Sequence, residues 1–163
     1  MARQELGFSL IELLIVSSLL LLLMLGVSTL FLASLTTDAR ISLRQELRAE
    51  GTYALDTLSY FIRNSKALTG CTTNGTSLII TGGDGGVSTF RLSGDQIASV
   101  SAARTTLLTV NPYAVKSGTF VLDCNENNGR PYVTVSFTLE RFDSQGKMID
   151  NDFRHTALVR NKQ

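Results

Sequence analysis

An unbroken apolar run dominates the first part of the chain. From Leu13 to Leu35 the sequence has neither a charged residue nor a proline, and as a helix it would be roughly 35 Å long at ~1.5 Å per residue. That length is enough to cross a bilayer core of ~30 Å. A secretory signal peptide has an apolar core of only ~7 to 15 residues, whereas this run is longer and has an acid, Glu12, near its start. We therefore expect the segment to stay with the protein as a membrane-spanning helix.

After Leu35 the pattern becomes amphipathic, and no proline occurs before Pro112. Apolar positions recur every three or four residues while charged residues lie off this stripe, which is typical of a helix with one buried face. The apolar positions are Leu43, Leu47, Ala54, Leu58, Phe61 and Ile62, and the charged positions are Arg44, Arg48, Asp56 and Arg63. The pattern predicts one helix from Phe8 to Ala67, with Gly26 and Gly51 as weak points that cost about 1 kcal/mol each relative to alanine.

Beyond Gly70 the apolar period changes from about four residues to two, which predicts β-strands separated by turns rich in glycine, asparagine and aspartate. The predicted strands are Ser77–Thr81, Val87–Leu92, Gln96–Val100, Thr105–Val110, Thr119–Leu122, Tyr132–Glu140 and Phe153–Val159. An antiparallel sheet of several hairpins has an apolar face that must be buried against another element. The amphipathic stripe could bury that face, or could instead pack against neighbouring helices in a polymer; the strand candidates favour the first role. We therefore expect an α+β fold in which a long amino-terminal helix packs on an antiparallel sheet.

A short motif precedes the apolar run. Residues 7–13 read GFSLIEL, after a short polar leader, Met1–Leu6. Over about residues 1–35 the chain resembles the processing site of type IV prepilins and type II secretion pseudopilins. The resemblance implies that a membrane-embedded prepilin peptidase cuts between Gly7 and Phe8 and methylates the new amino terminus of Phe8. It also implies a leader at residues 1–7, a transmembrane and assembly helix at 8–35, and a pilin-like globular domain at 36–163 that includes the amphipathic helix.

Glu12 is the one acid close to the apolar run. A lone carboxylate at membrane depth costs about 2.5 to 3.5 kcal/mol on insertion scales and is usually paired. The terminal amine of Phe8, four residues earlier, is the obvious partner after cleavage, on the same chain or, as the resemblance implies, on a neighbouring subunit. Alternatively, Glu12 could lie at the level of the lipid headgroups, where the free-energy cost of its charge is small. If the pairing holds, Phe8 and Glu12 give the register of assembly.

Length and charge limit the remaining possibilities. The chain has 163 residues, which is enough for one small domain on a membrane helix. Its formal net charge is +1, so its composition does not favour binding to a polyanion. We therefore predict no nucleic-acid binding for the domain as a whole. Arg3 and the amino terminus before the span weakly indicate a cytoplasmic leader. The carboxyl-terminal domain would then face an oxidising space.

Two cysteines, Cys71 and Cys124, lie beyond the apolar run. A disulfide between them would stabilise the fold by roughly 4 kcal/mol on the loop-entropy model. The alternative is a pair of unrelated buried thiols.

No enzyme constellation can be assembled from the sequence, so we predict a protein without a catalytic site, a metal site or a cofactor. His155, the single histidine, has no cluster of cysteines or carboxylates at ligand spacing. Gly82–Gly86 lacks the lysine and the helix of a phosphate loop. The run Asp123–Gly129 is similar to the start of a calcium loop, but its glycine comes one residue late and its twelfth position is Thr134. A plain hairpin turn is the favoured interpretation of that run.

The function expected from these observations is that of a minor pilin, a structural subunit of a type IV pilus or a related filament. A type II secretion pseudopilin is the alternative. A membrane-anchored extracytoplasmic binding domain that never polymerises is a further one. The expected partners are other pilins or pseudopilins, the prepilin peptidase, an inner-membrane assembly platform and the membrane itself, which the chain would cross once. We expect it in the cytoplasmic (inner) membrane and, after assembly, in a pilus or pseudopilus.

Overall fold

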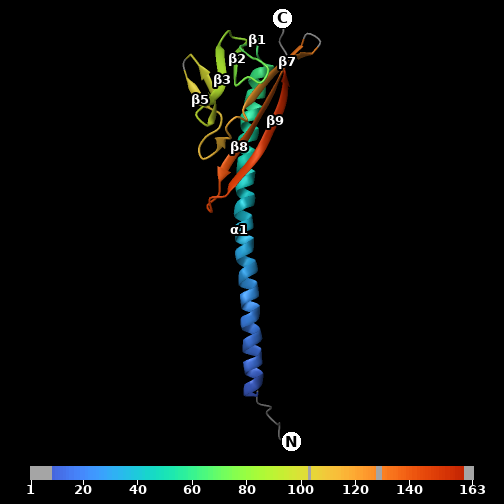
Figure 1. The fold of residues 1–163 in the computed structure, drawn as a ribbon, viewed down its shortest axis with the longest axis vertical. Helices are drawn as coiled ribbons and strands as arrows, with labels where there is room; N and C mark the ends of the chain where they lie inside the picture. The colour runs from blue at the N-terminus through green and yellow to red at the C-terminus, as the bar shows by residue number, and fades with distance from the viewer. Residues whose placement is uncertain (1–8, 103, 128–129, 160–163) are drawn as a thin grey trace. The chain divides into compact units, whose positions relative to one another are not determined.

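The structure is a computed structural model of the chain and describes residues 9–102, 104–127 and 130–159. Within these residues one long helix is followed by nine strands (Figure 1). The chain divides into two compact units, Met1–Ile41 and Ser42–Gln163. The first unit holds the apolar part of the helix, and the second holds the amphipathic part together with all nine strands.

Helix α1 (Leu10–Arg63) forms as the apolar and amphipathic patterns predict. At its end the side-chain amide of Asn64 donates to the carbonyl of Tyr60 (2.8 Å). This bond satisfies one of the carbonyls that a helix end leaves without a partner. The prediction of a single continuous helix is confirmed, but the helix ends at Arg63 and not at Ala67. The predicted first residue, Phe8, lies outside the described residues.

The first sheet is a meander in which each strand pairs antiparallel with the next, in the order β1-β2-β3-β4-β5. Its strands are β1 (Ala67–Thr69), β2 (Ser77–Thr81), β3 (Val87–Ser93), β4 (Gln96–Ser101) and β5 (Thr105–Leu107). In β2 the buried positions alternate with half-buried ones, as expected for a sheet with one face on a core.

The second sheet is built around its longest strand. Its strands are β6 (Ala114–Val115), β7 (Val121–Asn127), β8 (Arg130–Phe142) and β9 (Met148–Leu158). All three neighbours pair antiparallel with β8, and β9 does so along its whole length. Because a strand has only two edges, β6 and β7 share the edge opposite β9, where they pair with successive parts of β8.

One hydrophobic core joins the second half of α1 to both sheets. The helix contributes Leu47, Ala54, Leu58 and Ile62; the first sheet contributes Leu78, Ile80, Phe90 and Ile97; and the second contributes Val133, Val135, Phe137, Leu139, Phe153 and Ala157. The amphipathic stripe therefore covers the strands of its own domain. Phe61, also placed on the stripe by the sequence pattern, is 38% exposed and lies at the core's edge, with its ring 5.3 Å from that of Phe90.

The predicted α+β fold is thus confirmed, with one difference in the arrangement of the strands. They form two antiparallel sheets where the sequence pattern predicted one. The sheets meet where the backbone N–H of Val115 in β6 donates to the carbonyl of Asp95 in the turn between β3 and β4 (2.7 Å). A chain that switches sheets between β5 and β6 leaves no trace in hydrophobic periodicity, because the alternation within each strand is the same in either sheet.

Candidate functional site

The candidate assembly site begins at the first turn of α1. The carbonyl of Ser9 accepts hydrogen bonds from the backbone N–H groups of Glu12 (3.1 Å) and Leu13 (3.2 Å), which starts the helix. Glu12 is exposed and lies in the first helical turn, where the positive end of the helix dipole favours a carboxylate. Gly7 and Phe8, the residues of the predicted cleavage, lie outside the described residues.

The apolar half of α1 presents its side chains outward on every side. Its large apolar residues from Leu10 to Leu35 are between 51% and 80% exposed. By length and apolar composition, α1 is the one helix in the described residues able to cross a membrane. Such a surface is far larger than the apolar patches that soluble monomers expose. It therefore requires lipid or other apolar helices around it.

Four hydroxyl side chains in this half form hydrogen bonds with the helix itself. The hydroxyls of Ser17, Ser18, Ser28 and Thr29 each donate to a backbone carbonyl three or four residues earlier, over 2.7 to 3.0 Å. An unpaired hydroxyl in hydrocarbon would be costly, whereas one bonded to its own helix needs neither water nor a partner. The four hydroxyls are therefore compatible with an apolar surrounding.

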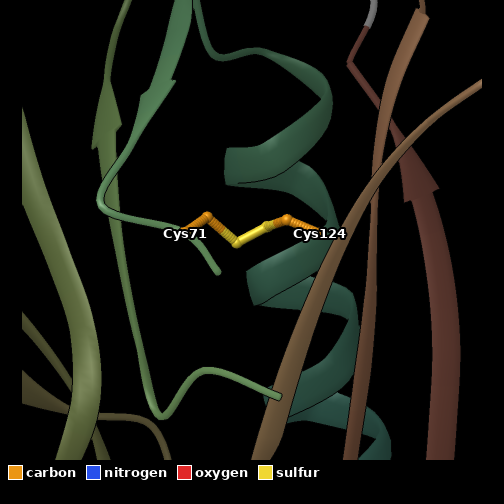
Figure 2. The surroundings of a disulfide bond; sticks show 2 residues. All are labelled: Cys71 and Cys124. Carbon is orange, nitrogen blue, oxygen red and sulfur yellow. A yellow bond between two sulfur atoms is a disulfide. The ribbon is translucent and has the colours of Figure 1, made fainter. Parts of the chain in front are cut away.

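In the second unit a disulfide joins Cys71, in the segment between β1 and β2, to Cys124 in β7 (Figure 2). The Cα atoms are 5.9 Å apart, a normal separation for such a bond. Close by, Gly75 and Leu122 exchange two backbone hydrogen bonds (3.1 and 2.7 Å). The bridge and the backbone pair together fix the loop between β1 and β2 of the first sheet against β7 of the second sheet.

Two glutamates on α1 hold the segment that connects the sheets. The Glu50 carboxylate accepts from the backbone N–H of Val110 (2.9 Å). Glu46 accepts from the Arg141 guanidinium (2.8 Å) and from the Tyr113 hydroxyl (3.0 Å). Arg141 also donates to the Tyr113 hydroxyl (3.0 Å) and lies over its ring, 5.2 Å from the centroid.

The network changes the pKa of the Tyr113 hydroxyl. Burial, followed by the hydrogen bond to Glu46 and its negative charge, raises the pKa of Tyr113 above the usual 10.0, while Arg141 acts in the opposite direction. The sequence gives no sign of this network, because its members lie far apart along the chain and only their elements' packing brings them together.

The residues weighed for metal binding lie in extended backbone. Asp123–Asn127 are part of β7, so that successive side chains point to opposite faces rather than converging as in a calcium loop. His155 is in β9, as predicted, and its Nε2 lies 3.3 Å from a guanidinium nitrogen of Arg63. No group of three or more histidine, cysteine, aspartate or glutamate side chains with metal-binding geometry occurs in the part of the chain that the structure describes.

Comparison with known proteins bears on the amino-terminal segment. A family model described as the prokaryotic N-terminal methylation motif matches residues 2–28. Neither the curated proteins nor the solved structures contain a match to the chain. The matched residues include the predicted processing site and the start of the apolar helix, and the long helix is followed by antiparallel sheets. The chain therefore carries a prepilin-type cleavage and methylation motif at its amino-terminal end, followed by an α+β arrangement that is consistent with a pilin-like fold.

Proposed function

We propose that the protein is a minor pilin, a non-enzymatic subunit that prepilin peptidase cuts between Gly7 and Phe8 and methylates at Phe8. After cleavage, the apolar half of α1 passes from the cytoplasmic membrane into a filament. The assembly platform of the inner membrane and other pilins are its partners in this step. The globular domain, on the far side of that membrane, remains outside the packed helices.

One observation carries this proposal: the apolar side chains of α1 up to Leu35 are at least 51% exposed. Lipid covers such a surface in the membrane, and the same helix from other subunits can cover it in a filament. In both surroundings the helix satisfies its own backbone groups and the hydroxyls of Ser17, Ser18, Ser28 and Thr29. The exchange of one apolar surrounding for another therefore requires no refolding of α1.

Glu12 would fix the axial position of each subunit's helix relative to that of its neighbour. In the first turn of α1 its carboxylate can reach the terminal amine that cleavage creates at Phe8 of a neighbouring subunit. Pairing removes the cost of a lone charge among apolar helices, about 2.5 to 3.5 kcal/mol on insertion scales. A subunit shifted along its neighbour would leave both charges unpaired.

Polymerisation is tested by fractionation. The protein is tracked in sheared filaments and in membranes, in cells with an active prepilin peptidase and in cells whose peptidase is inactive. Our proposal predicts the protein in the sheared fraction only when the peptidase is active. A protein that stays in the membrane fraction in both strains would be an anchored binding domain.

The same processing motif serves type IV pili and type II secretion systems. A pseudopilin is therefore the second candidate. Deletion of the gene separates the two machines, since loss of twitching or DNA uptake indicates a pilus and loss of enzyme secretion indicates a secretion system. We favour the pilus.

A further inference from the structure

A hollow of about 370 Å³ lies between the end of α1 and strand β9. Its lining consists of Asp56, Ser59, Tyr60, Arg63, Asn64 and His155, and we call it the α1–β9 hollow. The helical residues recur at three- and four-residue spacing and so share one face. His155 comes from the face of β9 that also carries the buried Phe153 and Ala157.

Ser59 is the first sign that the hollow takes a ligand. The residue is only 6% exposed, and its hydroxyl has no hydrogen-bond partner among the described residues. Buried hydroxyls in folded proteins are almost always bonded, because leaving one unpaired costs free energy. A hydroxyl left unpaired in the lining of a hollow is available to a group that enters it.

Arg63 is the second sign. Its guanidinium contacts His155 (3.3 Å), and no carboxylate of the described residues forms an ion pair with it. Asp56 stands seven residues earlier, roughly 10 Å along the helix, which is about one screening length at physiological salt. The Arg63 end of the hollow therefore presents a positive charge beside two further hydrogen-bonding side chains, Ser59 and His155.

Two exposed tyrosines lie on the last turns of α1, one in the lining of the hollow and one before it. Tyr60 is 65% exposed, and Tyr53, seven residues earlier on the same face, is 59% exposed. Tyrosine and arginine are among the residue types that are enriched where proteins bind one another. The rim thus has the composition of a protein-binding surface, and its centre has the chemistry of a carboxylate site.

We propose that the α1–β9 hollow binds the carboxylate of an acidic side chain presented by a partner protein. Arg63 supplies the charge-assisted hydrogen bond, and the hydroxyl of Ser59 donates the second bond. Asp56, at the other end, accepts a backbone N–H of the partner's chain. Tyr60, in the lining of the hollow, and Tyr53, about two turns earlier on the same face of α1, contact the peptide beside the acidic residue.

The single histidine of the chain makes the test direct. Because His155 lies in the hollow, the only histidine ring expected in a spectrum of the full-length protein in detergent micelles reports on the hollow directly. The probes are acetate, the capped peptide acetyl-Ala-Glu-Ala-amide and the same peptide with glutamine. We expect a saturable shift of the imidazole signal with acetate and, at lower concentration, with the glutamate peptide, and none with the glutamine peptide.

Variants separate a binding role from a structural one. Ser59→Ala should weaken binding of the glutamate peptide several-fold while the thermal midpoint stays equal or rises, because the lost hydroxyl has no partner in the free protein. Arg63→Gln should weaken binding about tenfold. The matched control is Arg154→Gln, which removes the same charge from the opposite face of β9 and should leave binding unchanged.

Three results would overturn the proposal. One is the lack of a saturable shift with either carboxylate probe. Another is equal weakening by Arg63→Gln and Arg154→Gln, which would mean that only overall charge matters. The third is binding of acetate with no tighter binding of the glutamate peptide, which would mean that the hollow takes small free carboxylates rather than a partner protein.

Discussion

The ring of Phe153 in β9 lies against the backbone of α1 at Gly51, in the space that a Cβ atom on Gly51 would occupy. Phe153 also stacks on Phe137 of β8, with ring centroids 5.3 Å apart and planes at 23°. The glycine therefore lets the second sheet approach the helix closely. A residue that weakens the helix in isolation is a packing requirement in the folded domain.

Replacing Gly51 with alanine should destabilise the domain by up to about 2 kcal/mol. The overlap of the added methyl with a buried ring costs about 1 to 3 kcal/mol, and a gain of about 1 kcal/mol in helix propensity offsets part of this cost. The measurement is thermal unfolding of the full-length protein in micelles. Gly26→Ala on the same helix is the control, because a Cβ there meets no atom within 4 Å. Equal midpoints for the two variants would refute the close contact.

How far the sequence predicts the fold can be seen in the second sheet. Tyr132–Glu140 alternates cleanly, and β8 forms there. The prediction for β9 began only at Phe153, whereas the strand begins at Met148. Residues 150–152 read DND, a composition that disfavours strands. They become extended because the hairpin continues the register of β8, pairing Asp150 with Glu140. Tertiary pairing overrides local preference here.

The same reasoning explains β7 and the short strands. Thr119–Leu122 was the predicted strand, but pairing with β8 extends it through Asn127, over residues whose composition predicted a turn. The pattern also misses β1 and β6, which have only three and two residues. Strands so short carry too few positions for an alternation to be read from the sequence.

The functional and structural sites also differ in how far the sequence predicts them. The amino-terminal motif is local, so the sequence alone is enough to recognise it. The cysteine count and the expected oxidising compartment favour a bridge over free thiols, and the fold confirms it by placing Cys71 beside Cys124. The contacts of Glu46 with Arg141, and of Arg63 with His155, join residues more than ninety positions apart, and no periodicity reports such pairs.

Removing the disulfide should lower the stability of the domain by roughly 4 kcal/mol on the loop-entropy model. The comparison is chemical unfolding of the wild type, with and without reductant, and of the double variant Cys71→Ser/Cys124→Ser. The reduced protein and the double variant should unfold at the same lower denaturant concentration. The assignment fails if both cysteines of the purified, non-reduced protein react as free thiols.

The Glu46–Tyr113–Arg141 network should make stability fall at high pH. The folded state raises the pKa of Tyr113, mainly through burial and Glu46, so it favours the protonated phenol. This contribution is complete below the unfolded-state pKa of about 10 and is lost as pH rises through the higher folded-state value.

The variant Tyr113→Phe isolates this effect. The stability difference between wild type and variant should be largest near pH 8 and should shrink above about pH 10. Urea unfolding of both proteins across this range provides the measurement. A difference that grows with pH would contradict the assigned direction of the shift.

Neutralising Glu12 should block assembly without affecting the globular domain. Glu12→Gln removes the charge that we pair with the amine of Phe8, while the exposed carboxylate lies far in sequence from the core. Asp38→Asn, an exposed acid on the same helix, is the matched control. We expect the first variant to be absent from sheared filaments and the second to be present at the wild-type level. Normal incorporation of Glu12→Gln would remove the pairing role.

The central claim is that processing turns a membrane-anchored chain into a filament subunit. Mass spectrometry of the amino-terminal peptide of the protein isolated from its own cells tests it most directly. We predict a chain that begins at Phe8 with a methylated amine. A native chain that still begins at Met1, or that begins at an unmethylated residue other than Phe8, would contradict the account.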